Sequence, residues 1–256
     1  MTILESIIFG LVEGITEFLP ISSTAHLIIT AEILKLEQSD FIKTFEVAIQ
    51  LGAILSIVVL YWRSLLQNKE VLKRIAAAFI PTAIVGFVLY ELIKGIFGSL
   101  NVVLWALFWG GVAIILFEHF YREKDGAHSE IAEISYKKAV IIGLFQSIAV
   151  IPGVSRAAAT IIGGLWLGLK RKTIVEFSFL LAVPTMLAAT GFDLYKNAPS
   201  FSSDEFILLA FGLVASFVFA TMAVKLLLKF IQQNDFKFFG AYRIVIAILF
   251  FAIFIK

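Results

Sequence analysis

Cysteine is absent from the sequence, and charged residues are few. Without cysteine, the 256 residues can form neither disulfides nor thiolate metal sites, and the three scattered histidines (His26, His119 and His128) give no zinc-ligand spacing. Only 16% of the residues are charged whereas 60% are hydrophobic, so a soluble domain of this length would have too little polar surface. A net charge of +2 is too small to indicate binding of nucleic acid. These shortages predict a protein that resides in lipid.

Apolar runs divide the chain into crossings and interrupted stretches. A helix needs roughly 20 apolar residues to cross a bilayer. Six stretches meet this length: 41–61, 75–93, 100–120, 173–195, 205–228 and 238–255. Two others, 3–34 and 139–169, are broken by proline at 20–23 and 152–155, and each half is too short to cross alone. The predicted fold is an all-α polytopic membrane protein with six transmembrane helices and two re-entrant helical hairpins.

The two halves of the chain resemble copies of one unit. Pro20 and Ser23 align with Pro152 and Ser155, and each unit holds one hairpin followed by three crossings. Because three is odd, the copies must face opposite sides of the membrane, which predicts an inverted-topology repeat. We expect a single membrane domain, 1–256, with repeats at about 1–122 and 136–256 joined by a cytoplasmic loop, 121–138.

Basic residues predict the orientation, because cytoplasmic loops carry an excess of lysine and arginine. Five basic residues fall on the side of the termini: Lys35, Lys43, Lys94, Lys196 and Lys256. Fourteen fall on the other side: Arg63, Lys69, Lys73, Arg74, Arg122, Lys124, Lys137, Lys138, Lys170, Arg171, Lys172, Lys225, Lys229 and Lys237. Both termini and the entry of the first hairpin are therefore expected outside.

Four ionisable residues, Glu13, Glu17, His26 and Arg156, lie within the interrupted apolar stretches. A charge in the middle of a membrane costs about 2.5–3.5 kcal/mol or more and is tolerated mainly when paired or facing a cavity. Glu13 and Glu17 are four residues apart, so both carboxylates lie on one helix face and need a cation, a shared proton or an arginine. They could instead merely bond to buried backbone or to Arg156.

Both proline breaks have the pattern of a helix start. Ser22 or Ser23 can cap one helix and Ser155 the other, and each helix start presents free N–H groups and the positive end of a dipole. Two such starts at the midplane, together with Arg156, suit a doubly charged anion such as a diphosphate on an apolar tail. Glu46 and Glu176 are interpreted as structural, and Glu118, His119, His128 and the charges of 122–138 as a solvated loop. Gly110–Gly111 and Gly163–Gly164 indicate close helix packing.

These residues resemble the signatures of the undecaprenyl-diphosphate phosphatase family of the bacitracin-resistance type. Residues 13–27, EGITEFLPISSTAHL, are similar to its first signature, and residues 152–160, PGVSRAAAT, to its second. FEVAIQLG at 45–52 and EFSF at 176–179 also fit. The chain departs from the family pattern at Ala25, Ala157 and Ala158, where glycine, serine and glycine are usual.

The resemblance implies hydrolysis of undecaprenyl diphosphate to undecaprenyl phosphate and phosphate at the outer side of the cell membrane, assisted by Mg²⁺ or Ca²⁺. This reaction recycles the lipid carrier for cell-wall synthesis and gives bacitracin resistance. The residue roles that it implies are Glu13 and Glu17 as metal or acid–base groups, Ser23 as nucleophile, His26 for proton transfer, and Ser22, Ser23, Ser155, Arg156 and Thr160 as phosphate binders.

Two questions stay open at the level of sequence. The attacking group is either Ser23 or a water deprotonated by Glu17 or His26. Inverted repeats with broken helices also occur in secondary transporters, so a polyprenyl-phosphate flippase without hydrolysis is the alternative. The expected partners are the polyprenyl diphosphate and the bilayer, without nucleic acid, and the sequence is compatible with a homodimer without fixing the oligomeric state.

Overall fold

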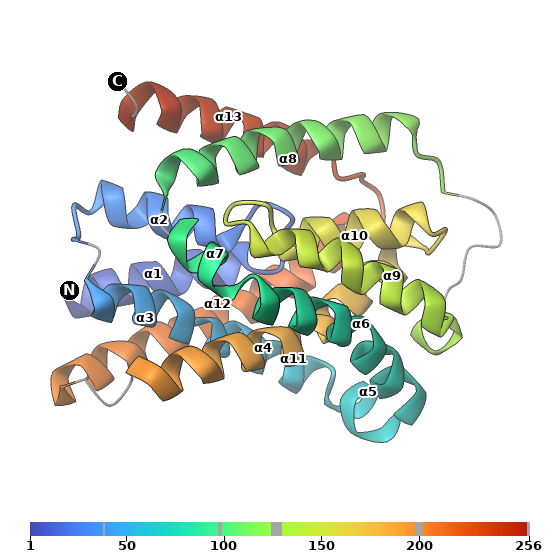
Figure 1. Cartoon of the computed structure of the whole chain (residues 1–256), viewed down its shortest axis with the longest axis horizontal. Coiled ribbons are helices and arrows are strands. Elements are labelled where there is room, and N and C mark those ends of the chain that lie inside the picture. The colour runs from blue at the N-terminus through green and yellow to red at the C-terminus, as the bar shows by residue number, and fades with distance from the viewer. Residues whose placement is uncertain (38, 97–98, 124–129, 198–201, 255–256) are drawn as a thin grey trace.

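The computed structural model describes residues 1–37, 39–96, 99–123, 130–197 and 202–254, and this part of the chain is helical with no strand (Figure 1). The elements are α1 (Ile3–Thr16), α2 (Ser23–Ile33), α3 (Asp40–Ala48), α4 (Gln50–Leu60), α5 (Trp62–Gln67), α6 (Lys69–Val88), α7 (Tyr90–Ile96), α8 (Leu100–Phe120), η1 (Ile131–Glu133), α9 (Tyr136–Ser147), η2 (Ile148–Val150), α10 (Arg156–Trp166), α11 (Arg171–Asn197), α12 (Ser203–Phe230) and α13 (Lys237–Phe254). The all-α prediction is confirmed.

Six spans are long and apolar enough to cross a membrane, and they coincide with the six predicted crossings. They are Asp40–Leu60, Lys69–Val88, Leu100–Phe120, Arg171–Phe192, Ser203–Phe230 and Lys237–Phe254. The second span begins and ends earlier than the predicted 75–93. It begins at Lys69 because the Asn68 side chain accepts hydrogen bonds from the N–H groups of Glu70 and Val71, and it ends at Val88 before the separate helix α7. The chain is a multi-pass membrane protein.

The two interrupted stretches form helix pairs with a break between the members. The first break, residues 17–22, separates α1 from α2, and the second break, residues 148–155, includes η2 and separates α9 from α10. Both breaks end on a serine with positive φ, Ser22 at 71° and Ser155 at 78°. A non-glycine residue in this region is uncommon and costs backbone strain, so the surrounding structure must hold both serines in place.

Small residues bring each helix pair against the other half of the chain. Helix α1 packs on α12 and α9 packs on α6. A Cβ atom on Gly10 would lie 2.3 Å from the carbonyl oxygen of Gly212, and one on Gly143 would lie 2.0 Å from that of Ala78. Because apolar side chains gain little over lipid tails, close backbone approach of this kind is how membrane helices associate. The first helix of each pair is therefore seated on the opposite half.

The two termini of the described chain lie at one end of the molecule, and helix α5 lies at the opposite end. In Figure 1 the start of α1 and the end of α13 both lie at the left, whereas α5 lies at the right. Helices α8 and α13 lie side by side along the top of the view and contact each other. The two termini of the described chain thus lie at the same end of the bundle.

Glu118 is not part of a solvated loop, and that prediction is wrong. It lies in the last turn of α8 with its side chain 2% exposed, and both of its oxygens accept hydrogen bonds from Arg171. Oε1 also accepts from the N–H of Phe236 at 3.2 Å. Burial of a carboxylate is tolerated here because three donors satisfy it. His119 is exposed, but it lies in the last turn of α8 rather than in the predicted loop, and His128 lies outside the described residues.

The segment predicted as the loop 121–138 is shorter than expected. Residues 131–133 form the short helix η1, and α9 begins at Tyr136 because the Ser135 hydroxyl accepts a hydrogen bond from the N–H of Lys138. Residues 124–129 lie outside the described part.

Candidate functional site

The two helix starts are capped in the same way. The hydroxyl of Ser22 accepts a hydrogen bond from the N–H of Ala25 at 3.4 Å, and that of Ser155 accepts from the N–H of Ala158 at 3.2 Å. Ser22 and Ser155 are the N-caps of α2 and α10, which confirms the predicted helix starts and selects Ser22 over Ser23 as the cap. Ser23 is the first residue of α2, and its hydroxyl does not cap the helix.

An ion pair joins the two breaks. Nη2 of Arg156, at the start of α10, donates to Oε1 of Glu17 at 2.9 Å, with side chains that are 11% and 7% exposed. The guanidinium also lies 5.6 Å above the ring of Phe18. Sequence positions 139 apart are therefore in direct contact, and the acid of the first break faces the arginine of the second.

Ser23 completes this contact from the other side of Glu17. Its hydroxyl donates to Oε2 of Glu17 at 2.5 Å, so the two carboxylate oxygens serve Arg156 and Ser23 separately. A hydroxyl that is hydrogen-bonded to a carboxylate is the arrangement in which the carboxylate can act as a general base. We call Glu17, Ser23 and Arg156 the core cluster.

Glu13 lies one helical turn before Glu17 and is fully buried. Neither of its oxygens accepts a hydrogen bond from a donor group, although the Glu17 carboxyl group is close enough to share a hydrogen with it, and Glu46 and Arg156 are near enough to interact with it electrostatically. Glu46, interpreted as structural from sequence, is thus a buried neighbour of Glu13. Burial of an ionised carboxylate without donors costs free energy. Glu13 is therefore expected to bind a cation or to be protonated.

The residues fit a divalent cation in part. Mg²⁺ is commonly held by one or two carboxylates together with substrate phosphates and water. Glu13 supplies the unpartnered oxygens, and Glu17 is adjacent but already accepts from Arg156 and Ser23. Within the described residues no group of three or more histidine, aspartate or glutamate side chains is arranged to hold a metal alone. An ion at Glu13 would therefore draw its remaining ligands from the substrate and from water.

Ser178 supports Arg156 from α11, and sequence reasoning did not single it out. Nη1 of Arg156 donates to the carbonyl oxygen of Ser178 at 2.7 Å and approaches its hydroxyl at 3.2 Å. The hydroxyl of Ser178 lies 2.6 Å from that of Thr160. Thr160 is fully buried, so the structure places it behind Arg156 rather than on an open face. Nε of Arg156 is buried and has no partner.

His26 stands apart from the core cluster. Its Nδ1 lies 2.7 Å from the carbonyl oxygen of Ser22, and its Nε2 lies 2.8 Å from the hydroxyl of Tyr242. Its ring is nearly parallel to that of Tyr242, with an interplanar angle of 4°. The structure therefore brings Glu13, Glu17, Ser23 and Arg156 together and turns both nitrogens of His26 toward other partners.

Arg243 on α13 ties the two breaks together and was missed from sequence. Its side chain is completely buried, and each of its hydrogen bonds within the described residues goes to a backbone carbonyl oxygen. Its guanidinium donates to carbonyl oxygens of the first break, the second break and α8: Pro20, Gly153, Val154, Ala106 and Leu107. An arginine deep within an apolar span was the signal that could have identified it.

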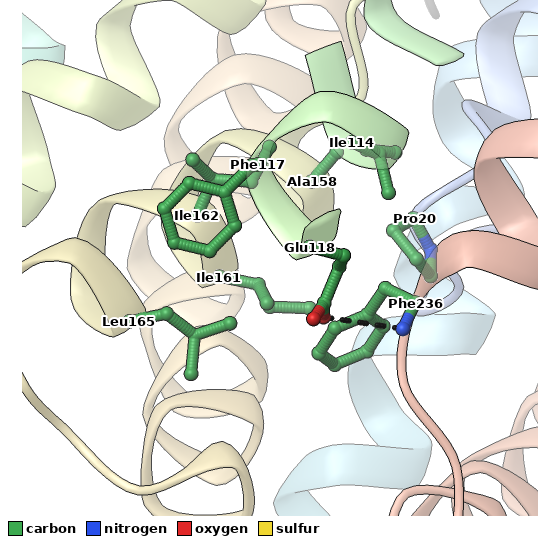
Figure 2. Close-up of a pocket in the computed structure, with 9 residues that line it drawn as sticks. All are labelled: Pro20, Ile114, Phe117, Glu118, Ala158, Ile161, Ile162, Leu165 and Phe236. Atoms are coloured by element: carbon green, nitrogen blue, oxygen red, sulfur yellow. Dashed lines mark hydrogen bonds between the residues drawn. The ribbon is translucent and has the colours of Figure 1, made fainter. Parts of the chain in front are cut away.

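The cavity drawn in Figure 2 is separate from these polar groups. It has a volume of about 10 Å³, close to that of a single water, and it lies between Pro20, α8, α10 and Phe236. Figure 2 shows Glu118 with its carboxylate turned to the N–H of Phe236. Ala158, one of the departures from the family pattern, is among the residues that line the cavity.

Comparison with known proteins identifies the family. The family model for "Bacitracin resistance protein BacA" matches residues 6–249. A protein of Aquifex aeolicus (strain VF5) named undecaprenyl-diphosphatase is 51% identical over 256 residues, 100% of both chains. One of the same name from Persephonella marina is 53% identical over 250 residues, 98% of each chain, and one from Wolinella succinogenes is 48% identical over 98% of this chain and 97% of its own. The chain belongs to the family of the bacitracin resistance protein BacA.

Proposed function

We propose that this protein is a membrane phosphatase that hydrolyses undecaprenyl diphosphate to undecaprenyl phosphate and inorganic phosphate. The observation that carries the proposal is the contact across the two breaks, in which Glu17 accepts from both Ser23 and Arg156. Two relatives that match 100% and 98% of the chain bear the name of this activity. Recycling of the lipid carrier for cell-wall synthesis and resistance to bacitracin follow from it.

The terminal phosphate is proposed to bind between the two helix starts. Arg156 offers a planar fork of donors, and the first N–H groups of α2 and α10 face an anion with the positive ends of their dipoles. Ser22 and Ser155 shape these starts as caps, and Ser23 lies at the first position of α2. Thr160 contributes by holding Ser178 and thereby Arg156.

The core cluster supports attack by Ser23. Glu17 takes the proton of the Ser23 hydroxyl while Oγ attacks the terminal phosphorus, and the bond from that phosphorus to the bridging oxygen breaks. Undecaprenyl phosphate leaves, and water then hydrolyses the phosphoserine to regenerate Ser23. Arg156 stabilises charge on the transferring phosphoryl group, and His26 serves proton transfer. In the alternative route, Glu17 or His26 deprotonates a water that attacks directly.

Glu13 and Glu17 are proposed to hold Mg²⁺ or Ca²⁺. When bound, such an ion withdraws charge from the phosphate oxygens. The role of Glu13 is to provide a carboxylate that no protein donor already occupies, and the role of Glu17 is shared between this ion and the core cluster.

In the membrane, the helix pairs α1–α2 and α9–α10 are proposed to be re-entrant hairpins of an inverted repeat, within one domain of two copies at about 1–122 and 136–256. The reciprocal packing of α1 on α12 and of α9 on α6 supports this symmetry. The excess of basic residues at the end that carries α5 supports a cytoplasmic location for that end. The site then opens to the outer side of the cell membrane, with both termini outside.

The test is phosphate release from undecaprenyl diphosphate by the purified chain, with and without EDTA. We expect release that requires a divalent cation and that falls about 10²-fold or more in Arg156→Lys, because an ammonium cannot contact Glu17 and Ser178 as a fork does. Farnesyl diphosphate would show how far the reaction depends on the tail. Absence of release with every divalent ion, together with transport of polyprenyl phosphate across vesicles, would replace the proposal with the flippase alternative.

A further inference from the structure

Helix α13 delivers two adjacent polar side chains, Tyr242 and Arg243, to the neighbourhood of the breaks. Arg243 is anchored by carbonyl oxygens of both breaks and of α8, so it fixes the position of this turn of α13 against the site. Tyr242, the preceding residue, is partly exposed and directs its hydroxyl to Nε2 of His26 at 2.8 Å. The position of the phenol is therefore set by the same residue that clamps the breaks.

The contacts of His26 define its hydrogen positions. The carbonyl oxygen of Ser22 can only accept, so the 2.7 Å contact requires a hydrogen on Nδ1. In the neutral ring Nε2 then carries the lone pair, and it accepts from the hydroxyl of Tyr242 at 2.8 Å. A partner on the second nitrogen commonly sets the tautomer and the orientation of a functional imidazole. Both ring nitrogens of His26 are thus held in place.

We propose that Tyr242 is a positioning residue for His26 in the phosphatase reaction, an inference that rests on the proposed function. A phenolic hydroxyl both donates and accepts, so it can donate to Nε2 of the neutral ring and accept from Nε2–H of the protonated ring. Tyr242 therefore keeps the ring in one orientation through a cycle in which His26 gains and loses a proton. It does so from α13, remote in sequence from the signature residues.

The hydroxyl of Tyr242 can be removed without removing the ring that packs on His26. Tyr242 and His26 are both partly exposed, and the phenyl ring alone would retain the nearly parallel arrangement of the two rings. Tyr242→Phe removes only the hydroxyl, so it separates orientation from packing. Tyr136→Phe is the matched control, because its hydroxyl also donates one hydrogen bond, to Glu70, on the exposed surface at 3.2 Å.

The experiment measures phosphate release from undecaprenyl diphosphate by the purified full chain in nanodiscs. We expect Tyr242→Phe to lower kcat about ten-fold while KM stays within about two-fold, the loss typical of an orienting hydrogen bond. Tyr136→Phe should match the wild type. With ¹⁵N-labelled histidine, the His26 resonances should report a hydrogen on Nδ1 in the wild type and a shifted Nε2 resonance in Tyr242→Phe, because the lone pair of Nε2 loses its donor, with His119 unchanged.

A wild-type kcat in Tyr242→Phe, or unchanged His26 resonances, would overturn the inference while leaving the proposed function intact. Absence of phosphate release by the wild type would instead remove the proposed function itself. The histidine spectra do not depend on activity, so they decide the orientation of His26 in either case.

Discussion

The hydroxyl of Ser23 donates to Oε2 of Glu17 at 2.5 Å, while Oε1 of the same carboxylate accepts from Arg156. In this arrangement Oε2 can accept the proton of Ser23, while the hydrogen bond from Arg156 to Oε1 holds the carboxylate in place. The expected consequences of this arrangement, and of the contacts around it, can be measured one residue at a time.

Ser23→Ala should lower kcat about 10³-fold or more, because the attacking oxygen is removed while the fold is retained. The measurement is phosphate release by purified protein, with folding checked by the fluorescence of the four tryptophans. Ser64→Ala, on α5 at the other end of the bundle, is the control. Substantial activity in Ser23→Ala would exclude the covalent route and leave attack by water.

Glu13→Gln should not lower the thermal midpoint measured in EDTA, because without a cation a buried carboxyl group that has no donor is favoured in its neutral form, which the amide resembles. The same change should abolish any stabilisation by added Mg²⁺ and lower activity about 10²-fold or more. Glu32→Gln alters an exposed carboxylate of the neighbouring helix α2 and should leave both properties unchanged. An undiminished Mg²⁺ effect in Glu13→Gln would place the ion elsewhere.

Gly110→Ala should destabilise the protein by about 1–3 kcal/mol and reduce activity, because the new Cβ atom would lie 2.0 Å from Nη2 of Arg243. Displacing that guanidinium releases carbonyl oxygens of both breaks at once. The control is Gly86→Ala in α6, where a Cβ meets nothing within 4 Å and should stabilise the helix by about 0.5–1 kcal/mol. Chemical denaturation of the two variants in detergent gives the comparison, and equal stabilities would contradict the clamp.

Glu118→Gln should cost about 3–5 kcal/mol, because it removes the buried partner of Arg171, where Glu118 is 2% exposed, and leaves only the longer contact with the more exposed Glu123 at 3.7 Å. The kcat of the folded fraction should not change, since this pair lies outside the core cluster. Lys73→Gln breaks only the exposed pair of Lys73 with Glu70, whose side chains are 60% and 47% exposed, and should have little effect on stability. A loss of kcat without a loss of stability in Glu118→Gln would show that this pair belongs to the site.

Orientation can be measured directly, because the chain has no cysteine and single cysteines can be introduced. Ser203→Cys should react with a membrane-impermeant thiol reagent added to intact cells, whereas Lys69→Cys should react only after the membrane is opened. Both positions are exposed at helix starts, so access to solvent is matched. The reverse labelling pattern would invert the proposed topology.

Local signals predicted much of the fold. Apolar run length located the six spans, and proline followed by serine located the starts of α2 and α10. The spacing of Glu13 and Glu17 predicted two carboxylates one turn apart on one helix face, and of the partners left open for them the structure shows Arg156 in contact with Glu17. These features depend on residues close together in the sequence or on the strong cost of charge in lipid.

Contacts between segments that are far apart in the sequence could not be predicted from apolar run length or residue spacing. Glu118 finds its partner Arg171 only when α8 and α11 are packed, and Tyr242 meets His26 across 216 positions. No spacing rule connects such pairs, so Glu118 was misinterpreted as solvated and Tyr242 and Arg243 were not singled out. An ionisable residue inside any apolar span is a signal that should be followed even when it lies far from a motif.

The bonds of Arg243 also bear on how the molecule can move. One guanidinium, carried by the second half of the chain, holds Pro20 and α8 of the first half together with Gly153 of the second. A carrier that exposes its site alternately to the two sides does so by rocking one half as a rigid body against the other. In this protein such a motion would have to break these bonds at the same time and leave the buried guanidinium of Arg243 without hydrogen-bond acceptors. The hydrogen bonds of Arg243 therefore oppose a rocking motion of the two halves, and they favour a site that keeps its structure while the lipid binds and dissociates.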